Sequence, residues 1–227
     1  MIVSSMFKFI VKELTPPFAY KALASVKMRL RSNQCGPAGI QEKKLFDGND
    51  GLFKSLLPKC SVYGEYGCGD STVYVAENSN SIIFSVDTSI EWIRAVRARL
   101  ANDERAMLHH VDLGNLGEWG RPLTYDKSKH FGDYTDWLWH RPLQPDLVLV
   151  DGRFRVCSFL TCLKHAKPGV LILFDVYVDR PHYHYVERYV QPIEVYGRQA
   201  LFEIPHLSAS DIGSIDEGIV NFRYVFD

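Results

Sequence analysis

A glycine-containing turn within residues 61–72, Ser-Val-Tyr-Gly-Glu-Tyr-Gly-Cys-Gly-Asp-Ser-Thr, constrains the fold of this chain more than any other stretch. A short apolar and aromatic run leads into Gly67 and Gly69, and a helix-compatible segment follows from Thr72. This order predicts a strand, a tight turn and a helix. Glycine suits such a turn because the backbone bends sharply and a ligand can approach without meeting a Cβ atom. The pattern therefore predicts an α/β crossover unit with a ligand at its turn.

Acidic residues near this turn narrow the choice of ligand. Asp87 ends the apolar run 82–86, where an acid about 20 residues after the glycines can accept hydrogen bonds from ribose hydroxyls. Glu65 and Asp70 flank the turn, and we expect both to repel the pyrophosphate that a dinucleotide brings to a helix start. Thr72 replaces the third glycine of the dinucleotide fingerprint. A ligand with a ribose, an ammonium and a sulfonium fits better, which favours S-adenosylmethionine over NAD.

Three cofactor motifs, Glu65-x-Gly67-x-Gly69, Asp87 and Asp112, together resemble those of class I S-adenosylmethionine-dependent methyltransferases. The resemblance runs from residue 45 to the C-terminus. Two phrases, Glu-Tyr-Gly-Cys-Gly-Asp-Ser-Thr and Val-Asp-Gly-Arg-Phe-Arg, are similar to small O-methyltransferases of cell-surface polysaccharide and glycan synthesis, including viral ones. The resemblance implies a Rossmann-like, doubly wound, mostly parallel seven-stranded sheet and methylation of a sugar hydroxyl. It implies cofactor contacts from Glu65, Tyr66, Gly67, Gly69, Ser71, Thr72, Asp87, Asp112, Leu113 and Asp151.

Apolar runs and helix-compatible segments alternate along the chain, as in a doubly wound α/β sheet. We expect strands at 61–66, 82–86, 107–111, 145–151 and 170–174, with helices at 71–78, 89–100 and 155–166. The aliphatic run in 145–151 is continuous, which is typical of a strand covered on both faces. Three further segments are interpreted as closing strands, at 193–196, 200–204 and 220–226.

Acids fall at the ends of the first five expected strands: Glu65, Asp87, Asp112, Asp151 and Asp175. Ligands of open α/β sheets bind outside the carboxyl ends of the strands. The first three acids are therefore expected on the cofactor side, and the last two beside the substrate. For Asp112 the alternative is a loop-capping role, and for Asp151 it is a cap on the following helix.

Transfer of a methyl group to a sugar hydroxyl benefits from a general base, because the hydroxyl is a poor nucleophile. Asp151 is the expected base, and His182 and His184 compete for that role. Arg153 and Arg155 are expected to orient the substrate or fix Asp151, although Arg155 is equally interpretable as a surface residue of its helix. The predicted catalytic residues are Asp151, Arg153, Asp175 and His182.

A magnesium-dependent variant of the reaction stays open. Some class I O-methyltransferases, according to the resemblance, bind Mg²⁺ with an acid after strand four and an acidic pair after strand five. Asp151 and Asp175 match two of these positions, but Val176 occupies the third and has no oxygen ligand to offer. We therefore predict no metal ligand.

The N-terminal segment differs in composition from the rest. Residues 1–31 contain six lysines and arginines against one acid, and apolar residues recur every four positions from Phe18 to Leu30. We expect residues 1–44 to form a basic helical segment that packs on a methyltransferase domain at 45–227. The alternative is a basic amphipathic helix that contacts a membrane surface or a partner enzyme.

Charge and composition limit the partners and the location. The formal net charge of -1 offers no basic footprint for nucleic acid, and the five cysteines include no Cys-x-x-Cys pair, which favours free thiols in a reducing compartment. No run approaches the roughly 20 apolar residues of a membrane span. With no signal-peptide pattern, a cytoplasmic location is expected.

The aromatic loop at 114–146 suits stacking on a sugar ring, so the predicted substrate is a glycan, a nucleotide sugar or a sugar. Three alternatives stay open. They are a metal-dependent small-molecule O-methyltransferase, an NAD-dependent oxidoreductase, and an inactive methyltransferase fold that serves as a binding subunit.

Overall fold

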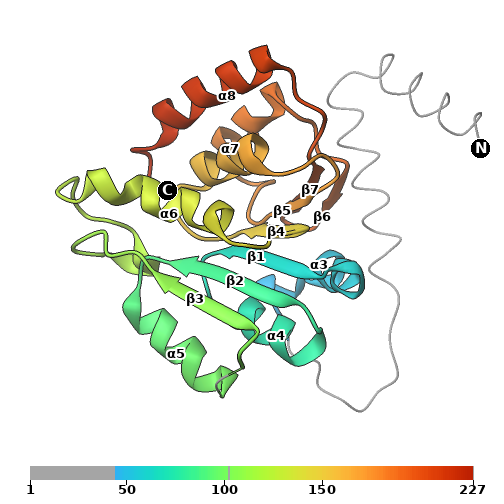
Figure 1. Cartoon of the computed structure of the whole chain (residues 1–227), viewed down its shortest axis with the longest axis vertical. Coiled ribbons are helices and arrows are strands. Elements are labelled where there is room, and N and C mark those ends of the chain that lie inside the picture. Colours follow the sequence, from blue (N-terminus) through green and yellow to red (C-terminus); the bar gives the residue numbers. More distant parts are fainter. Residues whose placement is uncertain (1–43, 102, 227) are drawn as a thin grey trace, which may run out of the picture. The chain divides into compact units, whose positions relative to one another are not determined.

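The computed structural model describes residues 44–101 and 103–226 (Figure 1). The chain divides into two units, residues 1–43 and residues 44–227, and only the second is described. The predicted basic helix of residues 1–31, and its alternative as a membrane or partner contact, lie outside the described residues. No helix in the described part of the chain is long and apolar enough to cross a membrane.

A seven-stranded mixed sheet forms the centre of the described unit, in the order β3-β2-β1-β4-β5-β7-β6. Its strands are β1 Val62–Tyr66, β2 Ile82–Asp87, β3 Ala106–His110, β4 Leu147–Val150, β5 Leu171–Phe174, β6 Glu194–Tyr196 and β7 Gln199–Glu203. Neighbouring strands from β3 to β5 are parallel, whereas β7 is antiparallel to both β5 and β6. The predicted Rossmann-like, doubly wound fold is confirmed.

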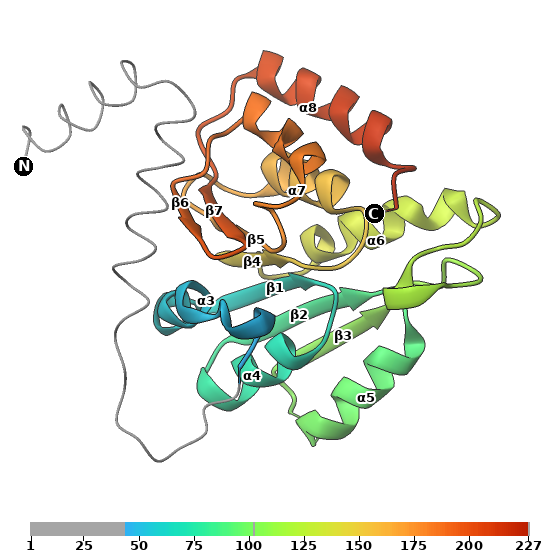
Figure 2. The same cartoon turned by 180° about the vertical axis from the view of Figure 1, so that it is seen from behind.

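Helices cover both faces of this sheet (Figures 1 and 2). One face carries α3 Gly51–Leu56, α4 Asp70–Asn78 and α5 Ile90–Leu100, and the other carries α6 Phe131–Asp136, α7 Arg155–His165 and α8 Ala209–Phe222. Short 3₁₀ helices complete the described elements, namely η1 Phe46–Gly48, η2 Leu57–Lys59, η3 Glu118–Gly120, η4 Ser128–His130, η5 Trp137–His140 and η6 Pro181–Arg188.

Strand β1 shows how side-chain alternation divides the core. Tyr63 packs with Phe53 and Val75 on the α3–α4 face, whereas Tyr66 packs on the opposite face with the residues of α6 and α7. Successive side chains of a strand point to opposite faces, so Glu65 shares the α4 face with Tyr63. This alternation places the Glu65 carboxylate against α4.

The predicted closing strand at 220–226 is wrong, because its first residues end helix α8 instead. Ser208 caps this helix and forms a reciprocal capping box with Asp211. Ile215 and Ile219 are buried against α7 at the four-residue spacing of a helix. The other strands and the three helices predicted between them begin and end within two residues of their expected limits.

Candidate active site

The glycine turn after β1 brings two strand ends into close approach. Gly67 has φ +92°, and a Cβ atom there would lie 2.7 Å from the Cα atom of Gly152 after β4. A Cβ atom at Gly152 would lie 2.0 Å from the hydroxyl of Tyr134. Around Gly69, by contrast, a Cβ atom would meet nothing within 4 Å among the described residues. Gly67 and Gly152 therefore pack the turn, and Gly69 has an open side from which a ligand can approach.

The Glu65 side chain lies inside the protein. It is fully buried, and its carboxylate accepts hydrogen bonds from the hydroxyls of Tyr63, Ser71, Thr72 and Ser85. Burial raises the pKa of Glu65, and the four hydroxyl donors oppose that rise. These internal partners tie β1 to the start of α4, and the predicted contact of Glu65 with the cofactor stays a prediction.

The side chains of Tyr66 and Asp70, also in this turn, likewise contact other parts of the protein. Tyr66 points into the core, where its hydroxyl donates to the Thr135 carbonyl at 2.5 Å. Asp70 faces α5 and forms an ion pair with Arg99 at 2.6 Å. Glu65 and Asp70 both lie at the start of α4 with partners inside the protein, and their predicted effect on the ligand stays a prediction.

Asp87 is the carboxylate that the turn holds in place. It is 8% exposed, and it accepts hydrogen bonds from the backbone N–H groups of Cys68 at 2.9 Å and Ser89 at 2.7 Å. Burial raises the pKa of Asp87, whereas these donors and the nearby charge of Arg153 lower it. A carboxylate fixed in this way at the end of β2 keeps further lone pairs for a ribose diol.

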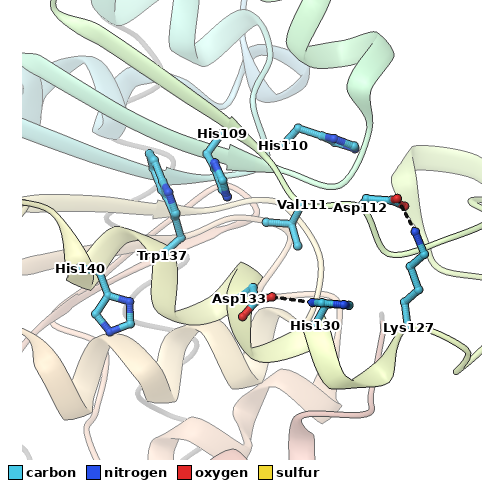
Figure 3. A pocket seen from close by; sticks show the side chains of 9 residues that line it. All are labelled: His109, His110, Val111, Asp112, Lys127, His130, Asp133, Trp137 and His140. Carbon is cyan, nitrogen blue, oxygen red and sulfur yellow. Dashed lines mark hydrogen bonds and ion pairs between the residues drawn. The ribbon is translucent and has the colours of Figure 1, made fainter.

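A cavity of about 530 Å³ opens beside the end of β3 (Figure 3). It is lined by His109, His110, Val111, Asp112, Lys127, His130, Asp133, Trp137 and His140. Asp112 is the predicted adenine ligand. Its carboxylate forms an ion pair with Lys127 and also accepts from the Gly114 N–H at 3.0 Å, so the loop-capping contact is present. The Leu113 side chain is buried, so the predicted contact of Leu113 with the cofactor would have to come from its backbone.

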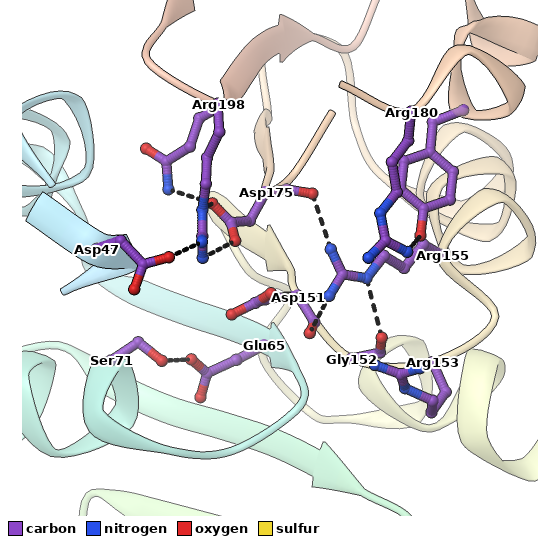
Figure 4. A network of polar contacts seen from close by, with 12 residues as sticks. Asp47, Glu65, Ser71, Asp151, Gly152, Arg153, Arg155, Asp175, Arg180 and Arg198 are labelled. Carbon is purple, nitrogen blue, oxygen red and sulfur yellow. Dashed lines mark hydrogen bonds and ion pairs between the residues drawn. The ribbon is translucent and has the colours of Figure 1, made fainter. Parts of the chain in front are cut away.

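Asp151 and Arg155 form the centre of the polar network after β4 (Figure 4). Arg155 Nη2 lies 3.0 Å from Asp151 Oδ1, and the same guanidinium donates to the carbonyl oxygens of Asp151, Gly152 and Asp175. The Arg155 side chain is only 7% exposed, so its surface alternative is wrong and its role in fixing Asp151 is confirmed. Phe154 is the N-cap residue of α7, so Asp151 is not the helix cap.

The electrostatics of Asp151 are those of a candidate base. Its side chain remains 29% exposed. Desolvation raises the pKa of Asp151 to about 7, the Arg155 charge opposes that rise, and the nearby Asp175 carboxylate adds to it. A general base works best with a pKa near the working pH.

Asp175, after β5, is fully buried and held by two residues that the sequence reading missed. Arg198 donates to its carboxylate through Nε at 3.0 Å and through Nη2 at 2.6 Å, and Gln199 donates at 3.0 Å. Arg198 also forms an ion pair with Asp47. Only the register of the β5–β7 pair, which places Phe174 opposite Ala200, brings these residues to Asp175.

The remaining predicted catalytic residues lie on two sides of the network. The backbone N–H of Arg153 donates to the Tyr134 hydroxyl, and the Arg153 charge lowers the pKa of Asp87, so Arg153 lies on the Asp87 side of the network. His182 lies exposed on η6 with its ring 4.3 Å from that of Tyr183. His184 is oriented by the Tyr177 carbonyl, 3.2 Å from its Nε2 atom.

The residues after β4 and β5 do not fit a magnesium site. Both Asp175 oxygens accept hydrogen bonds from Arg198 or Gln199, and Val176 has no oxygen in its side chain. Across residues 44–101 and 103–226, no group of three or more His, Cys, Asp or Glu side chains is arranged to hold a metal ion. A cation between Asp151 and Asp175 would have to displace Arg198.

Backbone strain follows both strand ends. Phe154 has φ +53° and Val176 has φ +54°. A β-branched residue in this region is a genuine outlier, and such residues persist where the surrounding structure over-determines them.

Cys68, in the glycine turn, is buried with its thiol pKa raised by desolvation, which argues against a nucleophilic role.

Comparison with solved structures identifies the family. A methyltransferase-like protein from Silicibacter pomeroyi is 30% identical, with a TM-score of 0.65 over 74% of this chain and 91% of that protein. The N-methyltransferase NodS from Bradyrhizobium japonicum, in complex with S-adenosyl-L-homocysteine, is 12% identical, with a TM-score of 0.49 over 79% and 97% of the two chains. A methyltransferase from Geobacter sulfurreducens is also 12% identical, with a TM-score of 0.47 over 89% and 96%. No family model and no functionally curated protein matches the sequence.

The sheet order, the glycine turn and the Silicibacter likeness define one class of protein. The chain belongs to the class I S-adenosylmethionine-dependent methyltransferases.

Proposed function

We propose that this protein transfers a methyl group from S-adenosylmethionine to a sugar hydroxyl of a glycan or surface polysaccharide, with Asp151 as the general base. The observation that carries this proposal is the Asp151 carboxylate. It lies at the end of β4, remains partly exposed, and has a pKa raised to about 7. Bases tuned to neutrality are typical of sites that remove a proton from a poor nucleophile.

The residues around the glycine turn fit S-adenosylmethionine. Asp87, fixed by two backbone donors, would hold the ribose diol, and the open face at Gly69 admits the cofactor without a steric clash. Asp112 and the backbone of Leu113 would hold the adenine. The Asp112 carboxylate would then accept hydrogen bonds from both Lys127 and the adenine amino group. When bound, the cofactor supplies an electrophilic methyl group on a sulfonium.

In the transfer step, Asp151 would accept the proton of the sugar hydroxyl, whose oxygen would take the methyl group that the bound cofactor supplies, with S-adenosylhomocysteine as the leaving product. Arg155 fixes the Asp151 carboxylate in one orientation through its 3.0 Å contact. Arg198 compensates the charge of Asp175, so that Asp151 is the carboxylate available to take up a proton. Arg155 and Arg198 therefore act as positioning residues in this proposal.

The sugar specificity draws its support from the aromatic and polar surroundings of this base. Tyr177, Tyr183 and His184 follow β5 and pack together next to the Asp175 end of the network, with the Tyr177 and His184 rings 4.7 Å apart. Tyr177 and Tyr183 are too buried to stack on a sugar, so the support comes from the partly exposed His184 ring and from the fixed Asp151 carboxylate, which can accept hydrogen bonds from sugar hydroxyls.

The first test is calorimetric binding of S-adenosylmethionine, S-adenosylhomocysteine and NAD to the wild type and to Asp87→Ala. The expected result is micromolar binding of the two adenosyl ligands, at least tenfold weaker in the variant, and no binding of NAD. Transfer of a labelled methyl group to a panel of oligosaccharides, surface polysaccharides and nucleotide sugars follows. Cofactor binding with no transfer to any sugar would refute the sugar specificity. Absence of cofactor binding would favour the alternative of an inactive binding subunit.

A further inference from the structure

We infer that the methyl acceptor carries an anionic group, a carboxylate or a phosphate, and that Arg180 binds it. This inference rests on the proposed function, because it assigns a chemical class to the acceptor of that reaction. Arg180 lies in the loop that leaves β5, five residues after Asp175 and immediately before η6 (Figure 4). In open α/β sheets this edge is where ligands bind.

Arg180 is held in place although its residue is exposed. Its Nη1 atom donates to the Tyr183 hydroxyl at 3.2 Å, and its guanidinium carbon lies 5.7 Å from the centroid of the Tyr183 ring. Tyr183 itself is fully buried and packs on Phe174 of β5, with ring centroids 4.9 Å apart. A guanidinium oriented by a buried ring loses less conformational entropy on binding a ligand than a freely rotating one.

The charge of Arg180 is not compensated in the way its neighbours are. Arg155 forms an ion pair with Asp151, and Arg198 forms ion pairs with Asp175 and Asp47. Among the described residues, no carboxylate forms an ion pair with Arg180. Arg180 is therefore an oriented cation at the acceptor end of the site.

The other arginine at this ring does not take part in the same way. The guanidinium carbon of Arg155 lies 5.9 Å from the centroid of the same Tyr183 ring, but Arg155 is buried and its charge is paired with Asp151. Tyr183 is itself fully buried, so a ligand at this place meets the exposed guanidinium of Arg180 and not the ring.

The chemistry of the ligand follows from the geometry of arginine. A guanidinium presents a planar fork of donors that matches the two oxygens of a carboxylate or a phosphate, and a neutral sugar uses this fork poorly. The acceptor is thus either a sugar with its own carboxylate, such as a uronic acid, or a sugar joined to phosphate, such as a nucleotide sugar. In both cases Arg180 would hold the anionic group while a hydroxyl of the same molecule faces Asp151.

The test compares anionic and neutral ligands on matched variants. The ligands are glucuronic-acid oligosaccharides, their carboxyl-reduced glucose counterparts, and UDP-glucose, each titrated by calorimetry into protein with S-adenosylhomocysteine. The variants are the wild type, Arg180→Gln, and Arg188→Gln as a control. Arg188 suits this purpose because it is also exposed and also lies over a tyrosine ring, 4.9 Å from the centroid of Tyr185.

The expected result is that the wild type binds the uronic-acid oligosaccharides or UDP-glucose at least tenfold more tightly than the neutral sugars. Arg180→Gln should remove this preference, and Arg188→Gln should keep it. Preference for the uronic acids alone identifies the anion as a carboxylate, and preference for UDP-glucose alone identifies it as a phosphate. Equal binding of neutral and anionic ligands by the wild type, no binding of any anionic ligand, or an unchanged preference in Arg180→Gln would overturn the inference.

Failure of the inference and failure of the proposed function remain distinguishable. Methyl transfer to neutral sugars that Arg180→Gln leaves unchanged would support the proposed function and refute the anionic acceptor. Arg180-dependent binding of anionic sugars without methyl transfer to any of them would support the anion site and refute the proposed reaction. Circular dichroism and S-adenosylhomocysteine affinity of each variant report whether the fold and the cofactor half are intact.

Discussion

Removal of Arg198 should destabilise the fold through the carboxylate that it leaves behind. Arg198→Met deletes two hydrogen bonds to Asp175, at 3.0 and 2.6 Å. The fully buried Asp175 carboxylate then keeps the hydrogen bond from the Gln199 side chain. Breaking a buried ion pair by removing one partner costs about 3–5 kcal/mol. The Arg198 side chain is 25% exposed, so we expect the lower end, a loss of about 3 kcal/mol in the free energy of unfolding.

Urea denaturation at pH 7.5 measures this loss, and a second substitution tests its cause. Asp175→Asn in the Arg198→Met background removes the uncompensated charge and should restore most of the lost stability. Asp47→Asn is the matched control, because Asp47 pairs with the same arginine but its side chain is 83% exposed. Exposed pairs contribute little to stability, so its unfolding midpoint should not move.

Two outcomes would refute this reasoning. If Arg198→Met unfolds at the wild-type midpoint, Asp175 does not depend on its buried ion pair. If the double variant is as unstable as Arg198→Met alone, the loss comes from packing and not from charge. A kinetic readout is independent of both: the Arg198 charge lowers the pKa of Asp151, so its removal should move the acidic limb of the kcat/KM profile to higher pH.

Three further results are expected. Asp151→Asn should lower kcat/KM by about 100-fold or more without weakening S-adenosylhomocysteine binding. In the wild type, kcat/KM should fall as the pH drops below about 7, because only the ionised Asp151 carboxylate accepts a proton. A kcat/KM that does not change between pH 6 and 8 would contradict the base assignment. Val176→Gly should raise the free energy of unfolding by about 1 kcal/mol, because glycine relieves the backbone strain at φ +54°. Val176→Ala should not raise it, and equal urea midpoints for the two variants would show that no strain is released. Activity should survive EDTA unchanged, because the Asp175 oxygens are engaged by Arg198 and Gln199; loss of activity that Mg²⁺ restores would show that a metal displaces them.

The sequence predicted the parts of the molecule that depend on local signals. The strand, turn and helix around Gly67 follow from glycine placement, and the position of Asp87 follows from the end of an apolar run. The orientation of Glu65 was open to the same reading, because strand alternation places it with Tyr63 on the α4 face. The hydroxyls of Ser71 and Thr72, six and seven residues later in the first turn of α4, were the signal that this carboxylate has internal donors.

Long-range register explains what the sequence did not reveal. Arg198 follows a glycine in the turn between β6 and β7, and nothing adjacent in the sequence connects it with Asp175, 23 residues earlier. Only the antiparallel pairing of β7 with β5 brings the two together. The missed helix α8 is a different case, since the capping box of Ser208 and Asp211 was readable as a helix start.

The close approach of Gly67 and Gly152 makes the proposed cofactor side and the proposed acceptor side of the site share a single wall. An alanine at Gly152 would place its Cβ atom 2.0 Å from the Tyr134 hydroxyl and 2.8 Å from the backbone nitrogen of Gly67. The added methyl group would therefore press on the turn that admits the cofactor and on the segment that carries Asp151. If the proposed roles hold, we expect substitutions here to lower cofactor affinity and the rate of methyl transfer together, so that neither side of the site can vary at this wall independently of the other.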